Sequence, residues 1–198
     1  MAPQLYLITP VAADPDRFAQ TLLSVLQAAP FSALLVRQGN LDDAAYAQFA
    51  ATLVSTAQGA GCAVLIQDDV ALARRLGADG VHVTGGPSAV KAAVGALKPG
   101  LIVGAGNSTT RHDAMTMGEM DVDYLFFGPL DGAIDSNAAD LAEWWAATFE
   151  IPAVLSDPAA TPDIDARGAE FLALSASIWN ADNPAAAAAA IANAMAVA

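Results

Sequence analysis

The chain is poor in basic residues, and this scarcity restricts its partners. Only eight Lys and Arg stand against 21 Asp and Glu, so the 198 residues carry a formal net charge of −13. A protein with this balance has no general basic surface for nucleic acid or for an anionic membrane. A phosphorylated ligand would need a metal ion or several backbone N–H groups in place of the missing cations. We therefore expect a small-molecule ligand, and neither nucleic acid nor a membrane, as partner.

Cysteine and long apolar stretches are scarce too. Cys62 is the single cysteine, which excludes an internal disulfide and a cysteine cluster for a metal. Its neighbours are apolar, which favours a buried and unreactive thiol. No stretch is long and apolar enough to span a membrane. Residues 1–6 hold neither a basic region nor the apolar core of a signal peptide, so we expect a cytoplasmic protein.

What the chain has in quantity is apolar sequence in short runs. Hydrophobic residues make up 55% of the chain, and the runs lack strict apolar–polar alternation, as expected for parallel strands buried on both faces. Eight runs alternate with helical patterns, which favours a (β/α)8 TIM barrel over an open doubly wound sheet. We expect one domain over residues 1–198 and leave a homodimer open. The expected strands are 5–9, 33–37, 63–67, 80–83, 101–105, 124–127, 153–155 and 171–174.

The helices between these runs have recognisable starts. Asp14 is placed to cap a helix that opens at Pro15, and Pro184 opens the last one, whose alanine run favours a helix. Thr109 or Ser108 is expected to cap the fifth helix. Further helices are expected over 42–60, from Pro87, around 141–149 and, as a short one, from Thr161-Pro162. The three tryptophans, Trp144, Trp145 and Trp179, are interpreted as packing or interface residues.

Residues 62–83 form the most informative stretch, a strand–helix–strand unit. The first strand ends in Asp68 and Asp69, and Gly77 closes the short helix. The short connections make the two strands parallel. Carboxylates at the carboxyl end of a parallel strand lie where barrel enzymes keep their chemistry. Asp68 is therefore a candidate metal ligand. The alternative is that Asp69 or Asp68 caps the helix while the other is solvated.

Other strand ends carry further candidates, each with a structural alternative. Arg37 is a candidate anion ligand, or else forms a salt bridge to Asp68. Gly106 and Asn107 lie in a Gly-x-Gly turn that either approaches a ligand or only joins strand to helix. His82, between two valines, is favoured as a hydrogen-bonded core residue over a catalytic one. Ser175 and Ser177 end the eighth strand as ligand donors or as part of a polar loop.

Four segments together resemble the thiamine phosphate synthase and TenI-type family of small (β/α)8 barrels. The resemblance covers almost the whole chain and implies a transferase that joins hydroxymethylpyrimidine diphosphate to thiazole phosphate with Mg²⁺ and releases pyrophosphate. It implies that Asp68 binds the metal, that Arg37 binds substrate and that Gln67 stands for an asparagine of the family. The segments are Leu5-Tyr6-Leu7-Ile8-Thr9, Leu65-Ile66-Gln67-Asp68-Asp69-Val70 with Gly77-Ala78-Asp79-Gly80-Val81-His82, residues 123–129, and residues 168–179.

The chain also departs from the family pattern at several strand ends. The second metal carboxylate falls within Thr84-Gly85-Gly86, and the strand-five serine falls at Gly106. The Thr-Lys-Thr phosphate loop falls within residues 130–135, and the phosphate-binding glycine pair at Asp157-Pro158. Asp157 brings negative charge, and Pro158 removes an N–H. Asp131, Asp135 and Asp157 are interpreted as a solvated acidic surface, with a site for a metal or cationic ligand as the alternative.

These features leave three hypotheses about function. The first is a synthase-type transferase of thiamine biosynthesis with a divergent site. The second is a non-catalytic or re-purposed barrel that binds a small pyrimidine-like or cationic ligand. The third is a thiazole tautomerase-like isomerase, which ranks last because Ser108 stands where that group has its strand-five histidine.

Overall fold

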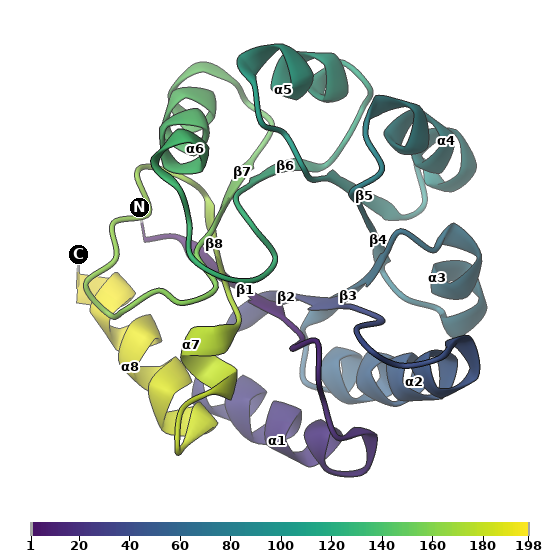
Figure 1. The fold of residues 1–198 in the computed structure, drawn as a ribbon, viewed down its shortest axis with the longest axis vertical. Helices are drawn as coiled ribbons and strands as arrows, with labels where there is room; N and C mark the ends of the chain where they lie inside the picture. Colours follow the sequence, from purple (N-terminus) through teal and green to yellow (C-terminus); the bar gives the residue numbers. More distant parts are fainter. Residues whose placement is uncertain (1, 198) are drawn as a thin grey trace.

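The structure is a computed structural model that describes residues 2–197. Eight parallel strands form a closed barrel in which each strand pairs with the next and β8 pairs with β1. Figure 1 looks into this ring of strands, with the helices arranged around its outside. The expected (β/α)8 barrel is confirmed. The strands are β1 (Gln4–Ile8), β2 (Phe31–Val36), β3 (Ala63–Gln67), β4 (Gly80–Val83), β5 (Ile102–Ala105), β6 (Tyr124–Phe127), β7 (Ala153–Ser156) and β8 (Phe171–Leu174).

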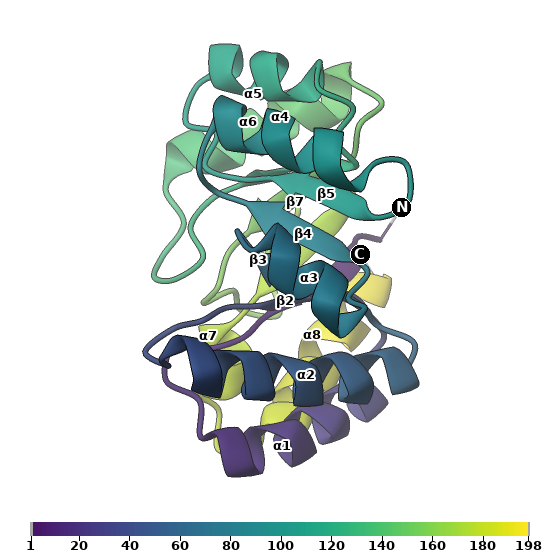
Figure 2. The ribbon, with the colours of Figure 1, turned by 90° about the vertical axis from the view of Figure 1, so that its right-hand side faces the viewer.

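The helices pack on the outer face of the barrel, as the side view in Figure 2 shows. Within residues 2–197, none of them is both long enough and apolar enough to cross a membrane. They are α1 (Pro15–Ala28), α2 (Asp43–Gly59), α3 (Val70–Leu76), α4 (Pro87–Leu97), α5 (Arg111–Gly118), α6 (Ser136–Thr148), α7 (Ala176–Trp179) and α8 (Pro184–Val197).

Alternation along each strand divides the buried residues into two sets. One set fills the barrel and includes Tyr6, Leu65, Tyr124 and Phe126. The other, much larger set packs between the strands and the surrounding helices. Both faces of every strand are therefore covered, which explains why the strands are apolar without strict alternation. The expected packing role of the tryptophans is confirmed, since Trp144 and Trp179 pack against the outer set and Trp145 belongs to it.

Strand positions agree well with the sequence-based expectation. The strands β3, β4, β6 and β8 have the expected bounds, and the others differ by one or two residues at one or both ends. Asp14 caps α1 as expected, by accepting a hydrogen bond from the backbone N–H of Asp16. Four of the strands, β3, β5, β6 and β7, are followed directly by a glycine or a carboxylate, which marks their ends in the sequence.

The connection between β7 and β8 corrects one expectation. No helix begins at Thr161, and residues 157–170 form turns and irregular chain. Local side-chain bonds compete with the helix here: Thr161 donates to the Asp163 carboxylate, and Asp165 accepts from the backbone N–H of Arg167. Arg167 also has a positive φ of 51°. The eighth strand is followed by two helices, α7 and α8, and the seventh by none among the described residues.

Two helix starts also differ from expectation. Thr110, rather than Thr109 or Ser108, caps α5, because its Oγ1 accepts from the backbone N–H of Asp113 while donating to that residue's carboxylate. Helix α6 begins at Ser136, five residues before the expected start at residue 141. Asp135 is its cap and accepts from the backbone N–H of Ala138 at 2.7 Å.

Candidate functional site

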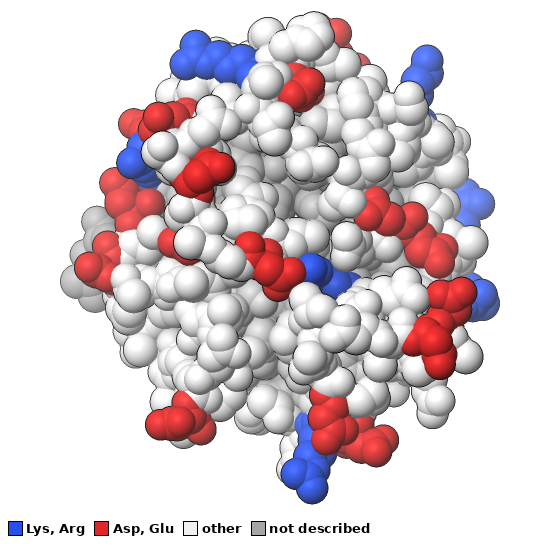
Figure 3. All heavy atoms as spheres, viewed as in Figure 1, with Lys and Arg blue, Asp and Glu red and all other residues white. Residues whose placement is uncertain are grey.

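The carboxyl ends of the strands surround a small pocket at the mouth of the barrel, with a volume of about 290 Å³. Residues from β3, β4, β6 and the segments after β4, β5 and β6 line it. This is the end of the barrel where (β/α)8 enzymes place their sites. Figure 3 shows this face with red groups around the rim and one blue group near its middle. The lining residues are Gln67, His82, Thr84, Asn107, Phe126, Gly128, Pro129 and Leu130.

Asp68 lies at the end of β3 and is tied to the end of β4. One of its carboxylate oxygens accepts from the backbone N–H of Thr84 at 2.6 Å, and the other accepts from the Thr84 hydroxyl. Its φ is 55°, an unusual conformation that these bonds help to hold. Asp69, in contrast, caps α3 by accepting from the backbone N–H of Leu72 at 2.8 Å. Asp69 is therefore the residue that caps the helix, and Asp68 faces the end of β4.

Asp68 has no second carboxylate beside it that could bind the same metal ion. Among residues 2–197, no three His, Cys, Asp or Glu side chains lie close enough to form a metal cage. Thr84 stands where a second carboxylate would face Asp68. Magnesium is often held by one or two carboxylates together with substrate phosphates and water. The residues present therefore fit a metal that arrives with a diphosphate, and they do not fit a metal held by protein ligands alone.

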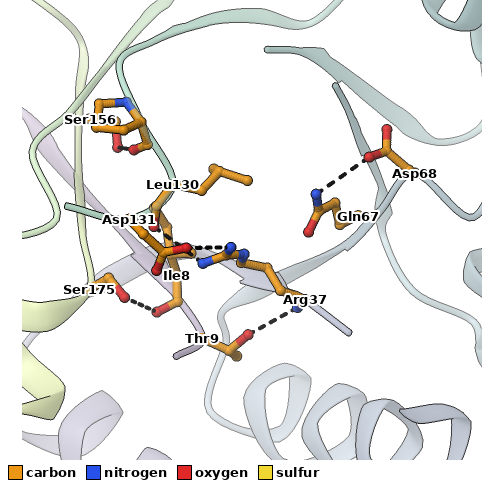
Figure 4. Close-up of polar contacts among 10 residues, drawn as sticks. Ile8, Thr9, Arg37, Gln67, Asp68, Leu130, Asp131, Ser156 and Ser175 are labelled. Carbon is orange, nitrogen blue, oxygen red and sulfur yellow. Dashed lines mark hydrogen bonds and ion pairs between the residues drawn. The ribbon is translucent and has the colours of Figure 1, made fainter. Parts of the chain in front are cut away.

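Arg37 follows β2 and points into the mouth. Its Nη2 donates to a carboxylate oxygen of Asp131 at 2.6 Å, and its Nη1 donates to the carbonyl of Leu130 at 3.3 Å. The Arg37 side chain is 12% exposed and the Asp131 side chain 52%. The alternative of a salt bridge between Arg37 and Asp68 is therefore wrong, because the loop after β6 supplies the partner. Figure 4 shows Asp131 and Leu130 on one side of Arg37 and Asp68 on the other.

The turn after β5 places Asn107 in the pocket lining. Asn107 has a positive φ of 64°, and its side-chain amide is 3.5 Å from the carbonyl of Thr84. Gly106 lies against His82, because a Cβ at residue 106 would stand 2.5 Å from Nε2 of the imidazole. The glycine thus meets a packing need inside the site as well as making the turn.

Ser175 and Ser177 lie outside the pocket lining. The Ser175 hydroxyl donates to the carbonyl of Ile8 at 3.1 Å, as Figure 4 shows. The indole N–H of Trp179 donates to the same carbonyl at 2.6 Å. The Ser177 hydroxyl is buried and has no partner among the described residues. The structure therefore gives Ser175 a role in joining the end of β8 to β1.

The three carboxylates of the expected acidic set have separate contacts. Asp131 pairs with Arg37, and Asp135 caps α6. Asp157 accepts from the backbone N–H of Ala159 at 3.3 Å, and partial burial raises the pKa of its carboxyl. Each has its own structural partner, so the set does not converge on one cation.

His82 is both a core residue, as expected, and part of the pocket lining, which the sequence analysis did not predict. It is fully buried, as a core histidine should be, and its Nδ1 lies 3.0 Å from the hydroxyl of Tyr124. It also lines the mouth pocket, beside its register partner Gln67. Burial lowers the pKa of the imidazole to about 4, so the ring is neutral at pH 7. The pairing of β3 with β4 could have indicated this position, because it places residues 67 and 82 side by side.

These observations define a small (β/α)8 barrel with a ligand pocket at the carboxyl ends of its strands. The family model described as "Thiamine monophosphate synthase" matches residues 5–178. The chain belongs to the thiamine monophosphate synthase family, which confirms the resemblance seen in its motifs.

Curated relatives are similar along nearly their whole length. A thiamine-phosphate synthase of Hyphomonas neptunium is 38% identical over 200 residues, covering 93% of this chain and 90% of that protein. One of Rhodospirillum centenum is 34% identical over 198 residues, covering 96% and 95%. The solved thiamine phosphate pyrophosphorylase of Pyrococcus furiosus superposes with a TM-score of 0.82 at 18% identity, covering 98% of this chain and 96% of that one. At that identity it supports the barrel fold alone.

Proposed function

We propose that this protein acts in thiamine biosynthesis as a thiamine-phosphate synthase. The reaction would join hydroxymethylpyrimidine diphosphate to thiazole phosphate and release pyrophosphate. The observation that carries the proposal is the similarity to curated synthases over more than nine-tenths of this chain. The pocket at the strand ends, about 290 Å³ in volume, agrees with it. We place the protein in the cytoplasm as part of the proposal, because the reaction uses phosphorylated intermediates.

Each candidate residue has a role in this proposal. Gln67 and Asn107 present side-chain amides to the pocket, and these would orient the pyrimidine ring. Asp68 would contribute a carboxylate to a magnesium ion bound with the diphosphate, which neutralises charge on the leaving group. Arg37 would bind a phosphate group after Asp131 moves away from its guanidinium.

The Arg37–Asp131 pair favours a second candidate function, a barrel that binds an unphosphorylated or cationic ring without transferring it. The guanidinium of Arg37 is already engaged by Asp131 at 2.6 Å and is therefore not free to bind a phosphate. Asp131 and Asp157 add negative charge where a phosphate would need donors. A ligand without phosphate would leave this pair intact and use the amides of Gln67 and Asn107 alone.

One experiment separates the two functions. Purified protein is incubated with both phosphorylated substrates and Mg²⁺, and thiamine phosphate is measured by its oxidation to a fluorescent product. The first function predicts product formation that EDTA abolishes and that Asp68→Ala lowers about tenfold or more. Calorimetry on the same sample measures binding of free hydroxymethylpyrimidine. Binding of the free ring without any product would overturn the transferase and support the second function.

A further inference from the structure

A second cavity, here called the amino-end cavity, lies at the amino ends of the strands, opposite the mouth of the barrel. Its volume is about 350 Å³. Small side chains, Ala33 on β2 and Ala63 on β3, leave this space, and Gln4, Ile102 and Phe171 stand around it at the first positions of β1, β5 and β8. The proposed synthase reaction takes place at the other end of the barrel, so it leaves this cavity without a role.

The polar groups at the rim of the amino-end cavity are paired with other protein groups. The Ser32 hydroxyl donates to the side-chain carbonyl of Gln4 at 2.6 Å. One carboxylate oxygen of Asp123 accepts from Lys98 at 2.6 Å, and the other accepts from the backbone N–H of Val103 at 2.7 Å. The rim therefore presents no unpaired charge to a ligand. The walls are apolar and include Leu65, Ile102, Val154 and Phe171.

Two tyrosines, Tyr6 on β1 and Tyr124 on β6, also line the amino-end cavity. The Tyr6 hydroxyl lies 3.0 Å from the Tyr124 hydroxyl, which lies 3.0 Å from Nδ1 of His82 on β4. All three residues are 6% exposed or less. They form a row of buried polar groups that begins beside the cavity and ends inside the barrel. Because a buried donor without a partner is costly, each proton in this row needs an acceptor.

The row holds one more proton than it can pair. Burial lowers the pKa of the His82 imidazole to about 4, so the ring carries a single N–H at pH 7. Burial raises the pKa of both tyrosines, so each keeps its O–H. Three donors therefore share two hydrogen bonds. Among residues 2–197, neither the Tyr6 hydroxyl nor Nε2 of His82 has a further partner, so one donor is left over.

The leftover donor lies at one end of the row. The Tyr124 hydroxyl, in the middle, is enclosed by its two partners and by Gly104, where a Cβ would stand 2.3 Å from the hydroxyl oxygen. At the His82 end, Nε2 is buried away from any acceptor of the described protein. At the Tyr6 end, a molecule in the cavity can supply an acceptor. Such a molecule favours one order, in which Nδ1–H donates to Tyr124, Tyr124 to Tyr6, and Tyr6 to the ligand.

We propose that the amino-end cavity binds a small, uncharged aromatic molecule whose hydrogen-bond acceptor takes the proton of the Tyr6 hydroxyl. The apolar and aromatic walls fit a flat ring, and the paired rim offers no charge to hold an ion. A volume of about 350 Å³ is at the lower end for small-molecule sites, which favours a single ring. The site is independent of the proposed function, because it lies at the opposite end of the barrel.

The first test measures the hydrogen bond from Tyr6 by calorimetry with two probes. Acetophenone is a single ring with a carbonyl acceptor, and cumene has nearly the same shape without one. Tyr6→Phe should weaken binding of acetophenone about three- to tenfold, the loss expected for one hydrogen bond, and should change binding of cumene less than about twofold. Equal effects on the two probes, or wild-type protein that binds neither, overturn the proposal.

The second test locates the bound ring. Ala33→Leu places a larger side chain in the cavity and should weaken both probes about tenfold or more. Ala63→Leu enters the cavity from the neighbouring strand, which keeps the test informative if Ala33→Leu does not fold. Ala28→Leu, at an exposed position near the end of α1, is the matched control and should change affinity less than about twofold. Unchanged binding in both cavity variants overturns the site.

The third test reads the proton on His82. The chain has two histidines, His82 and His112, so a His112→Gln variant assigns the imidazole signals in a ¹⁵N NMR spectrum at pH 7. In protein saturated with acetophenone we expect the proton on Nδ1, and a proton on Nε2 overturns the proposed order of hydrogen bonds. Inorganic pyrophosphate with Mg²⁺ should leave acetophenone affinity unchanged. Competition between them would place the ring in the mouth and overturn the amino-end site, whatever the outcome of the synthase assay.

Discussion

Two parts of the pocket mouth are built differently. The first, here called the β3–β5 arc, consists of Gln67, Asp68, Thr84 and Asn107 at the ends of adjacent strands. Its contacts run between neighbours in the barrel, such as the bonds from Thr84 to Asp68. The second, the β6 loop, is residues 128–135. It is held by contacts with remote strands, above all the bond from Arg37 to Asp131, residues 94 positions apart in the sequence.

The two parts differ in how much of their geometry the barrel itself fixes. Strand register fixes the β3–β5 arc, since Gln67 pairs with His82 across two hydrogen-bonded strands. The β6 loop leaves the barrel after Gly128, and contacts such as the Arg37–Asp131 ion pair, rather than strand register, fix its position. The charge beside Arg37 is therefore set by a loop residue, Asp131.

The largest expected effect tests how firmly the β6 loop is attached. Gly128 has a φ of 111°, and a Cβ there would lie 2.5 Å from the carbonyl oxygen of Ser156. Gly128→Ala should lower the free energy of unfolding by about 3 kcal/mol, through backbone strain and this clash. Urea denaturation measures the change.

Gly132→Ala is the control within the same loop. Gly132 also has a positive φ, 81°, but no atom lies within 4 Å of its Cβ position. Its substitution should cost only about 1 kcal/mol, the penalty for the left-handed conformation. Equal losses at the two positions would mean that contact with β7 does not anchor the loop.

The barrel and the β3–β5 arc could be predicted because their information is local. The strand bounds of β3 and β4 follow from apolar runs that end at Asp68 and Thr84, and short crossovers force neighbouring strands to be parallel. The cap of α5 was also within reach, since Thr110 and Asp113 have the spacing of a capping box. Each of these features depends on residues less than twenty positions apart.

The β6 loop and the barrel interior could not be predicted in the same way. The partner of Arg37 depends on the path of a loop that begins at Gly128, and no pattern near Arg37 specifies that path. Likewise, His82, Tyr124 and Tyr6 stand on three strands, and their hydrogen bonds exist only once the barrel closes. The prediction of a helix at Thr161 was wrong for another reason. The helical pattern there is weak, and local side-chain hydrogen bonds form in place of a helix.

A smaller effect is expected where Asp68 joins two strand ends. Asp68→Ala removes both bonds from Thr84 and leaves a φ of 55° on a residue without a polar side chain. The free energy of unfolding should fall by about 2 kcal/mol. Asp68→Gly removes the same bonds but relieves the backbone, so it should cost about 1 kcal/mol. A larger loss for the glycine variant would contradict the view that the side chain holds this conformation.

The smallest effect on stability is expected at the contact between the β6 loop and Arg37. Asp131 is half exposed, so Asp131→Asn should change the free energy of unfolding by less than about 1 kcal/mol. Its effect on anion binding should be clearer. Removing the carboxylate frees the Arg37 guanidinium, and affinity for inorganic pyrophosphate should rise about three- to tenfold, a gain that 1 M salt suppresses.

Asp43→Asn provides the matched control for charge. Asp43 is exposed at the start of α2, where Gln38 donates to it, and Arg37 does not contact it. This variant makes the same change in net charge near the same end of the barrel, so its pyrophosphate affinity should change less than twofold. If both variants gain equally, general repulsion by the acidic surface excludes the anion. If only Asp131→Asn gains, one loop residue separates this mouth from one that accepts a diphosphate.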